Sequence, residues 1–396
     1  MITRRHILST MTAAGAMSVW DGSLSSAFAA VPGERRFVFV ILRGALDGLA
    51  AVPAYGDPDY AGVRGGLALA RTGANPLLDL DGFFGLHPAL VNLKSYYDAK
   101  QAAVFHAICT PYRNRSHFDG QNVMETGGTA PNLMHDGWLN RALTAMGGKR
   151  QAIAVAPTPP LVLTGKARAT SWMPDTLPEP DESYFARVAA LYDGDKVLGA
   201  SLQSAMALRA QSRAAMDDPA SKQKPKADLI PLFQGAGRLL AMADGPRIAV
   251  LDASGWDTHI NEGAGDGQLA RRLSALDSAL DAMKAALGAA WNQTAIVVAT
   301  EFGRTVKPNG SGGTDHGTGG AAFLLGGAVA GGTVHAEWMG LKPEALKDGR
   351  DLPARSDLRA LFKTVLADHM GVPRAALNGS VFPESGTAKA FKGLIA

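Results

Sequence analysis

The sequence predicts an α/β fold with three layers, in which helices cover both faces of a mostly parallel central sheet. Continuous apolar runs of strand length recur along the chain, and such runs are typical of strands buried on both faces of a parallel sheet. Segments with helical spacing of apolar residues separate these runs. This alternation is typical of βαβ units and of a sheet covered on both sides.

The apolar runs define the predicted strands. In chain order they are Phe37–Leu42, Ala102–Ile108, Ala152–Ala156, Ile248–Leu251, Ala295–Ala299 and Ala321–Leu325. Pro160–Thr164 is a further candidate strand. Residues 53–84 are rich in Pro, Gly and Asp, which predicts an irregular connection.

Helices are predicted where apolar residues recur at intervals of three and four. His87–Lys100 places Leu90, Leu93 and Tyr97 on one face, and Gln268–Leu287 carries a longer stripe of the same kind. Shorter helices are expected over 117–126, 137–146 and 357–369. Residues 165–245 are helix-prone and indicate a helix-rich insertion beside the sheet rather than a part of it.

The composition is that of an ordinary globular protein with a large core. The chain has 396 residues, of which 46% are hydrophobic and 19% charged, and its formal net charge is +3. This balance, without a dense Lys/Arg block after the N-terminus, argues against a nucleic-acid partner. Cys109 is the only cysteine, so an internal disulfide is excluded, and a small buried apolar role is favoured over a reactive thiol.

The N-terminus has the features of a twin-arginine signal peptide. Arg4 and Arg5 precede the mildly apolar run Ile7–Trp20, and Ala27-Phe28-Ala29 offers small residues for cleavage. A membrane anchor or an unstructured start is the alternative, but the run is shorter than the roughly 20 residues of a spanning helix. We therefore expect residues 1–29 to be removed by the twin-arginine export machinery. Residues 30–396 would then form one periplasmic or secreted domain without a stable membrane span.

Acidic residues and histidines follow the predicted strands. Asp47 comes after the first strand, Asp257 and His259 after Ile248–Leu251, and Glu301 directly after Ala295–Ala299. Because ligands of open parallel sheets bind at the carboxyl ends of the strands, these side chains are expected to gather at one edge. Carboxylates and imidazoles gathered in this way bind a cation or perform acid–base chemistry.

Two of these positions have simple structural alternatives. Asp257 and His259 are two residues apart, so on an extended stretch both face one point and suit a divalent metal. Otherwise Asp257 caps a helix and His259 is a polar surface residue. Glu301 is a candidate ligand or general base, or else it forms a structural ion pair with Arg304.

A glycine-rich loop at residues 312–320 carries Asp315 and His316. Its glycines let the backbone approach a ligand closely, and in a turn both side chains reach one site, or Asp315 orients His316. A flexible hairpin with an incidental histidine is the alternative.

Ser116 is expected at the N-terminus of the helix that follows the second strand. Unpaired N–H groups at such a position favour an anionic oxygen, and Arg113 and Arg115 add donors for it. Ser116 is a candidate nucleophile activated by a metal, although a plain N-cap is the simpler interpretation.

Several motifs together resemble a known set of exported bacterial proteins. They are Leu42-Arg43-Gly44-Ala45-Leu46-Asp47-Gly48-Leu49, Arg115-Ser116-His117-Phe118, Asp136-Gly137-Trp138-Leu139-Asn140-Arg141, Trp256-Asp257-Thr258-His259, Thr300-Glu301-Phe302-Gly303-Arg304 and Asp315-His316-Gly317. In this order, and after a twin-arginine start, they look like the family catalogued as domain of unknown function 1501. By fold that family is placed with the alkaline phosphatase and sulfatase superfamily.

The superfamily resemblance implies roles for individual residues. Asp47, Asp257, His259, Glu301, Asp315 and His316 would hold a divalent metal (Zn, Mn, Mg or Ca), and Ser116 would stand in the place of the nucleophile. Arg115 or Arg304 would clamp a small anionic substrate. Glu301 is followed by Phe302, whereas the superfamily pattern has a histidine there, so one expected imidazole is missing.

Three functions follow as hypotheses. The first is an exported metal-dependent hydrolase of phosphate or sulfate esters, in which Ser116 or an activated water attacks. The second is a non-catalytic periplasmic binding protein on an alkaline phosphatase-like fold with a degenerate site. The third is an enzyme of another class that uses one metal, since a fold alone does not decide chemistry.

Overall fold

A nine-stranded sheet forms the centre of the molecule in the computed structural model, which describes residues 35–147, 151–174, 188–192, 194–216 and 229–396. The predicted signal peptide, residues 1–29, lies outside the described residues. The strand order is β10-β4-β9-β8-β1-β7-β5-β6, and β11 pairs with β4. The strands are β1 (Arg36–Arg43), β4 (Ala102–Cys109), β5 (Ala152–Val155), β6 (Ala169–Ser171), β7 (Ile248–Ser254), β8 (Thr294–Thr300), β9 (Gly320–Leu325), β10 (Thr333–His335) and β11 (Ser356–Asp357). A separate antiparallel pair joins β2 (Leu78–Asp79) to β3 (Gly85–Leu86).

The central sheet is mostly parallel, as the apolar runs predicted. β1 pairs in parallel with both β7 and β8, and β5 pairs in parallel with β6 and β7. β9 is the exception among the described strands, because it runs antiparallel to β4 on one side and to β8 on the other. The amino end of β9 therefore lies at the edge where the parallel strands have their carboxyl ends.

Strand β1 shows why the sequence pattern was continuous rather than alternating. Its residues from Arg36 to Leu42 are all buried. Val38, Val40 and Leu42 belong to the hydrophobic core on one face of the sheet, and Phe37, Phe39 and Ile41 belong to the core on the other. A strand that is covered on both faces needs apolar side chains at every position.

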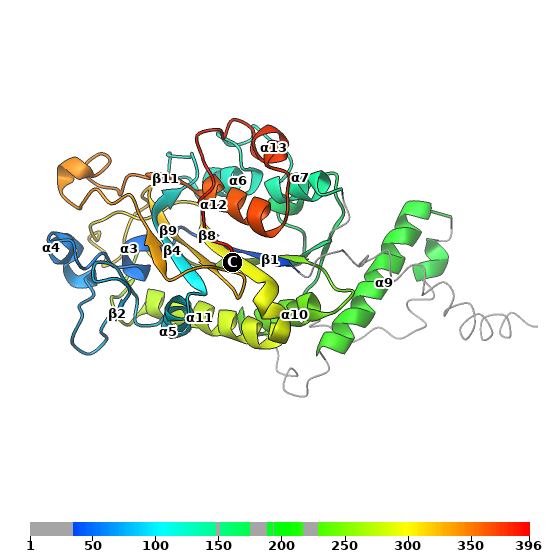
Figure 1. Cartoon of the computed structure of the whole chain (residues 1–396), viewed down its shortest axis with the longest axis horizontal. Coiled ribbons are helices and arrows are strands. Elements are labelled where there is room, and N and C mark those ends of the chain that lie inside the picture. The colour runs from blue at the N-terminus through cyan, green and yellow to red at the C-terminus, as the bar shows by residue number, and fades with distance from the viewer. Residues whose placement is uncertain (1–34, 148–150, 175–187, 193, 217–228) are drawn as a thin grey trace, which may run out of the picture.

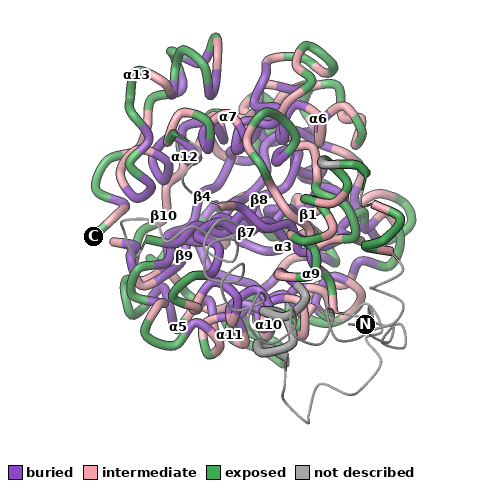
Figure 2. Tube along the Cα trace, turned by 90° about the vertical axis from the view of Figure 1, so that its right-hand side faces the viewer, coloured by how far each residue is buried: buried purple, intermediate pink, exposed green. Residues whose placement is uncertain are grey.

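Helices form a layer on each face of the sheet (Figure 1). One layer contains α5 (Val91–Asp98), α10 (Leu229–Ala241) and α11 (Gln268–Leu287), and the other contains α6 (His117–Thr126), α7 (Trp138–Ala145) and α12 (Leu358–Thr364). The buried segments run between these layers in Figure 2. This confirms the three-layer α/β fold. The remaining α-helices of the described chain are α3 (Gly48–Ala51), α4 (Tyr60–Arg64), α9 (Lys196–Met216) and α13 (Arg374–Ala376).

Two predictions about local structure differ from the model. Pro160–Thr164 is not a strand, since Leu161–Leu163 form a 3₁₀ turn in which Leu163 N–H donates to the Pro160 carbonyl at 2.9 Å. The turn buries Val162 and Leu163 beneath α7, so an apolar run after two prolines resembled a strand.

The segment 165–245 is not purely a flank of the sheet. Its β6 pairs with β5, although the half-buried residues of β6 carry no apolar run that would reveal a strand. Helix α10 packs along α11 and buries Phe233, Leu239 and Leu240, whereas α9 extends away from the sheet (Figure 1). None of the helices in the described part of the chain combines the length and apolar character needed to span a bilayer.

Candidate metal centre

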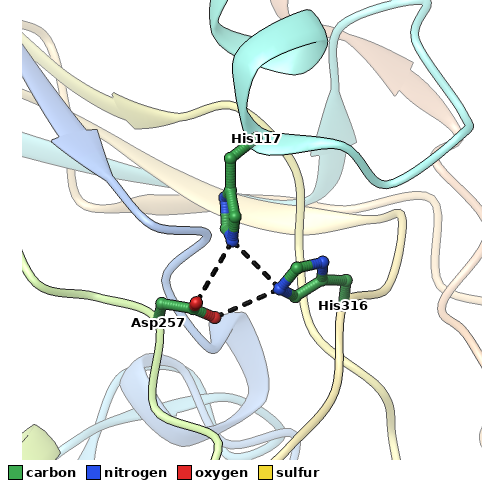
Figure 3. Close-up of side chains that lie close together, drawn as sticks. All are labelled: His117, Asp257 and His316. Carbon is green, nitrogen blue, oxygen red and sulfur yellow. Dashed lines mark hydrogen bonds and ion pairs between the residues drawn. The ribbon is translucent and has the colours of Figure 1, made fainter.

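Two imidazoles and a carboxylate converge at the carboxyl edge of the sheet (Figure 3). One ligand atom from each of His117, Asp257 and His316 lies within 4.8 Å of the others. The Nε2 atoms of His117 and His316 are 2.9 Å apart. Asp257 Oδ2 is 3.4 Å from the former, and its Oδ1 is 3.2 Å from the latter.

A third imidazole adjoins this group. His259 Nε2 lies 3.0 Å from His316 Nε2 and 3.0 Å from Asp257 Oδ1. Three Nε2 atoms and one carboxylate are thus brought together by residues from distant parts of the chain.

The sheet explains why these residues meet. His117 begins α6 after β4, and Asp257 and His259 follow β7, so all three come from carboxyl ends of parallel strands. His316 precedes β9, whose reversed direction brings its entry loop to the same edge. Glycines make this loop fit, because a Cβ at Gly313 or Gly317 would lie within 2.5 Å of backbone atoms of neighbouring loops.

Each imidazole has an acceptor at its other nitrogen. His117 Nδ1 lies 2.8 Å from Glu301 Oε1, His316 Nδ1 lies 2.9 Å from the Arg115 carbonyl, and His259 Nδ1 lies 3.3 Å from Asp315 Oδ1. Such acceptors keep the ring hydrogen on Nδ1 and leave a lone pair on Nε2. Backbone carbonyls and carboxylates in this place are typical of histidines that bind a metal.

The spacing of the facing atoms fits a small divalent ion. Two Nε2 lone pairs 2.9 Å apart repel each other, so the arrangement requires a proton or a metal cation between them. In a tetrahedral site with bonds of about 2.0–2.1 Å, ligand atoms are about 3.3 Å apart. The contacts of 2.9–3.4 Å described above are close to this value.

The pKa shifts agree with a site that exchanges a proton for a metal. The hydrogen bond that His117 Nδ1 donates to Glu301 raises the pKa of His117 above its usual value, although burial opposes it. Burial lowers the pKa of His316 below its usual value. Burial alone would raise the pKa of Asp257, but the hydrogen bond and charge of Arg304 outweigh it and hold the pKa low. Metal binding would therefore displace a proton chiefly from His117.

Glu301 lies behind His117 rather than facing the convergent atoms. Its carboxylate is fully buried and accepts hydrogen bonds from Gly44 N at 2.9 Å, Gln121 Nε2 at 3.1 Å and Thr300 Oγ1 at 2.8 Å. Together with the His117 contact, these donors occupy both oxygens. In this position Glu301 orients His117 and strengthens it as a ligand.

Asp47 belongs to a different cluster. Its Oδ1 caps α3 by accepting from Ala50 N at 3.0 Å, and its Oδ2 forms a 2.8 Å ion pair with the buried Arg64. The two charges thereby compensate each other without a metal. Within the described part of the chain, the hydrogen bonds and the ion pair of Asp47 join it to Ala50 and Arg64 and not to the three histidines.

The predicted anion-binding side chains have protein partners. Arg304 is buried, and its Nη1 lies 2.5 Å from Asp257 Oδ1. Arg115 pairs through its guanidinium with Asp351 and Asp348. Ser116 is the N-cap of α6, and its Oγ accepts from Asp119 N at 3.5 Å. It directly precedes His117 and is partly exposed.

His117 is the member of the cluster that the sequence interpretation assigned no role. It stands in the motif around Ser116, where the serine drew attention as an N-cap or nucleophile. The signal was the absent imidazole after Glu301. His117 follows β4, which β9 separates from β8, yet its Nδ1 lies 2.8 Å from Glu301 Oε1. Cys109 lies beneath this region and is buried, as predicted, and burial raises the pKa of its thiol to about 11.

The family follows from the sequence match. A model described as protein of unknown function (DUF1501) matches residues 102–380. The chain belongs to this family. The resemblance of the motifs is thereby confirmed, and the matched region contains His117, Asp257, His259 and His316. None of the curated proteins matches the sequence.

Two solved structures resemble the chain at low identity. The phosphonate monoester hydrolase of Agrobacterium radiobacter is 11% identical, covers 86% of this chain and 74% of its own, and has a TM-score of 0.32. The C-terminal periplasmic domain of EcEptC from Escherichia coli, in complex with Zn, is 12% identical, covers 92% of this chain and 93% of its own, and has a TM-score of 0.38. With both TM-scores this low, the fold and the site rest on the chain's own geometry.

Proposed function

We propose that this chain is an exported, metal-dependent hydrolase of phosphate or sulfate esters, related to the alkaline phosphatase and sulfatase superfamily. One observation supports the proposal above all. The Nε2 atoms of His117, His259 and His316 meet beside Asp257, and each ring has an acceptor at Nδ1. A donor set of imidazoles with one carboxylate suits Zn²⁺ or a similar borderline ion.

The chemistry that this site offers is attack on an ester of an anionic acid. A bound divalent ion would supply charge neutralisation for the ester oxygens and a lower pKa for a nucleophile. Ser116 places a hydroxyl at the start of α6 next to His117, where free N–H groups of the helix favour a negatively charged oxygen. Arg304 holds Asp257 ionised, and Glu301 holds His117 in one tautomer.

Export would follow the twin-arginine route through residues 1–29. That route carries proteins that have already folded, often around a metal or cofactor. A domain whose site is assembled from the whole length of the chain needs such a route if the metal is to be inserted before export.

Metal content of the purified, full-length mature chain is the first test. We expect close to one equivalent of Zn or Mn, lost in His316→Ala and in Asp257→Ala. His135→Ala is the matched control, since it removes an exposed imidazole outside the centre. A wild-type protein that takes up no divalent metal at micromolar concentrations, while folded, would refute the proposal.

Turnover is the second test. The metal-loaded protein should hydrolyse an aryl phosphate or an aryl sulfate, and a chelator should abolish the activity. Ser116→Ala separates the two nucleophiles. Loss of turnover with metal content unchanged identifies the serine, whereas retained turnover identifies water. Absence of hydrolysis of either ester by the metal-loaded chain contradicts a hydrolase.

A non-catalytic binding protein is the second candidate, and one observation favours it. The guanidinium groups of Arg115 and Arg304 are both engaged by carboxylates, so neither is free to clamp an anion. On this hypothesis the chain binds a metal and a small anion but turns nothing over. Calorimetric titration of the metal-loaded protein with phosphate and with sulfate distinguishes it, because binding without hydrolysis of the corresponding esters supports only this candidate.

A further inference from the structure

His316 is held by a neighbour whose backbone conformation is unfavourable. Arg115 adopts a left-handed conformation with φ of 62°, which residues with a Cβ rarely adopt. In this conformation its carbonyl oxygen lies 2.9 Å from His316 Nδ1. The contact keeps hydrogen on Nδ1 and directs the Nε2 lone pair toward His117 and Asp257.

A buried carboxylate secures that conformation. Asp351 is 0% exposed, and its Oδ2 lies 2.8 Å from Arg115 Nε and 2.6 Å from Arg115 Nη2. Two donors on one oxygen fix the guanidinium in orientation as well as in place. Asp348 also pairs with Arg115, at 3.2 Å, but its side chain is 62% exposed and the contact is screened by water.

The turn at residues 347–351, which contains Asp351, also contacts His316 through a second residue. Arg350, next to Asp351, donates from Nη2 to the His316 carbonyl at 2.9 Å. The turn itself is closed by backbone hydrogen bonds between Lys347 and Asp351 in both directions. Ring and backbone of His316 are therefore both tied to residues 347–351, none of which contributes a ligand atom to the cluster.

We propose that Asp351 is a positioning residue of the metal centre, which acts through Arg115 to fix the tautomer and direction of His316. The inference rests on the proposed metal site for its functional meaning, but its structural part concerns the metal-free protein. On this inference, Arg115 does not bind an anionic substrate but has a structural role. Its guanidinium anchors a backbone carbonyl. Contacts of this kind behind a metal ligand typically change metal affinity by about 10–100-fold.

The first experiment reads the tautomer directly in metal-free protein. Long-range ¹H–¹⁵N NMR spectra of the imidazoles should show His316 protonated at Nδ1 in the wild type. Asp351→Asn should produce a mixture of both neutral tautomers or an ε-protonated ring. Asp348→Asn is the matched control, since it alters the exposed carboxylate on the same guanidinium and should leave the spectrum unchanged. An unchanged His316 signal in Asp351→Asn would overturn the inference.

The second experiment measures metal affinity by competition with a chromophoric chelator. We expect Zn²⁺ to bind roughly 10-fold more weakly to Asp351→Asn, and unchanged to Asp348→Asn. The visible absorption bands of Co²⁺ at the site should shift only in the former. Equal affinities in wild type and Asp351→Asn would contradict the inference even though the wild type binds metal.

Arg115→Gly tests the same link from its other end, also in case Asp351→Asn folds poorly. Glycine adopts the left-handed conformation freely, so this change removes the guanidinium without backbone strain. Its thermal stability should fall, because Asp351 stays buried without its main ion pair. The folded variant should show the same loss of Zn²⁺ affinity and the same tautomer mixture as Asp351→Asn. The double variant should be no worse than either single one, because both act through one link. Wild-type affinity in Arg115→Gly would show that the ion pair positions nothing.

The outcomes distinguish this inference from the proposed function. If the wild type binds no metal but the His316 tautomer depends on Asp351, the proposed function fails and the positioning stands. If metal binds and neither tautomer nor affinity responds to Asp351, only the positioning fails.

Discussion

Asp47 and Asp257 both follow strands at the same edge of the sheet, yet they belong to clusters of opposite character. Asp47 is buried and lies between Arg64 and the buried Glu262, with which it forms a closed cluster that neutralises its own charge. Asp257 is about two-fifths exposed at its side chain and faces the Nε2 atoms of three imidazoles. Both carboxylates occupy the same kind of position after a strand. The side chains that each one contacts therefore determine whether it has a structural role or a binding role.

A carboxylate has a structural role when a buried arginine neutralises it, and it is available for binding when it faces groups that a cation can bridge. A buried arginine satisfies Asp47 permanently, and removal of either partner leaves an uncompensated charge in the core. Around Asp257, Arg304 shares Oδ1 with His259 and His316, and Oδ2 faces His117. We call the first group, Asp47, Arg64 and Glu262, the closed cluster, and the second, His117, Asp257, His259 and His316, the open cluster.

The largest effect on stability is expected in the closed cluster. Asp47→Ala leaves Arg64 buried without its ion pair, and we expect the free energy of unfolding to fall by about 3–5 kcal/mol. Chemical denaturation of metal-free protein measures it. A fall below about 1 kcal/mol would mean that the closed cluster is not a self-contained ion pair, and the contrast between the two clusters would be lost.

The pH dependence of stability provides the next test. Burial, with the charge of Asp47 adding to it, raises the pKa of Glu262 to about 8, so the folded protein holds a proton there that the unfolded chain releases near its ordinary value of 4.5. Stability contributed by this proton is complete below pH 4.5 and is lost as pH rises to about 8.

Glu262→Gln should remove this dependence. The amide keeps hydrogen-bonding groups beside Asp47 and Thr314 without a titrating proton. We expect the wild type to lose on the order of a few kcal/mol relative to the variant between pH 5 and pH 9. Denaturation curves at several pH values measure the difference, and parallel curves for the two proteins would contradict the assignment.

A smaller effect is expected behind the open cluster. Glu301→Gln keeps the shape of the side chain but weakens its hold on His117 Nδ1 and lowers the pKa of that ring. We expect metal affinity to fall by about 10–100-fold. Chelator competition measures it, with Gln121→Ala as a comparison that removes only one neutral donor to Glu301. An unchanged affinity would show that Glu301 does not orient a ligand.

The smallest effect is expected at the solvent side of the same edge. Phe118 follows His117 but is 88% exposed, so Phe118→Ala should change the free energy of unfolding by less than about 0.5 kcal/mol. Thermal unfolding of metal-free protein measures it. A loss above about 1 kcal/mol would mean that Phe118 is covered in solution.

The sequence predicted the fold class because burial on both faces leaves a local trace. The run Phe37–Leu42 is continuous in its apolar character, and the structure shows both faces covered. The direction of a strand leaves no such trace, so the reversal of β9 could not be predicted from Ala321–Leu325. Nor could β6, since three half-buried residues at the sheet edge need no apolar run.

The sequence predicted where in the fold the candidate site lies, but it did not predict the role of each residue in the site. Acidic residues after strands pointed to one edge of the sheet, where Asp257, His259 and His316 do meet. The sequence does not show whether a carboxylate faces an arginine, as Asp47 does, or a histidine ring, as Glu301 does. The Asp47 pair joins residues 17 positions apart and the Glu301 contact spans 184 positions, and a single sequence carries no record of either contact.

The reversed strand also fixes when the centre can form during synthesis. β9 fills the gap between β4 and β8, and the contact of His117 with His316 spans 199 residues. Such long loops close slowly, and they close only after the late segment has left the ribosome. A nascent chain that ends before residue 316 lacks one of the three converging imidazoles. On the proposed function, complete metal loading would therefore follow translation and folding of most of the polypeptide.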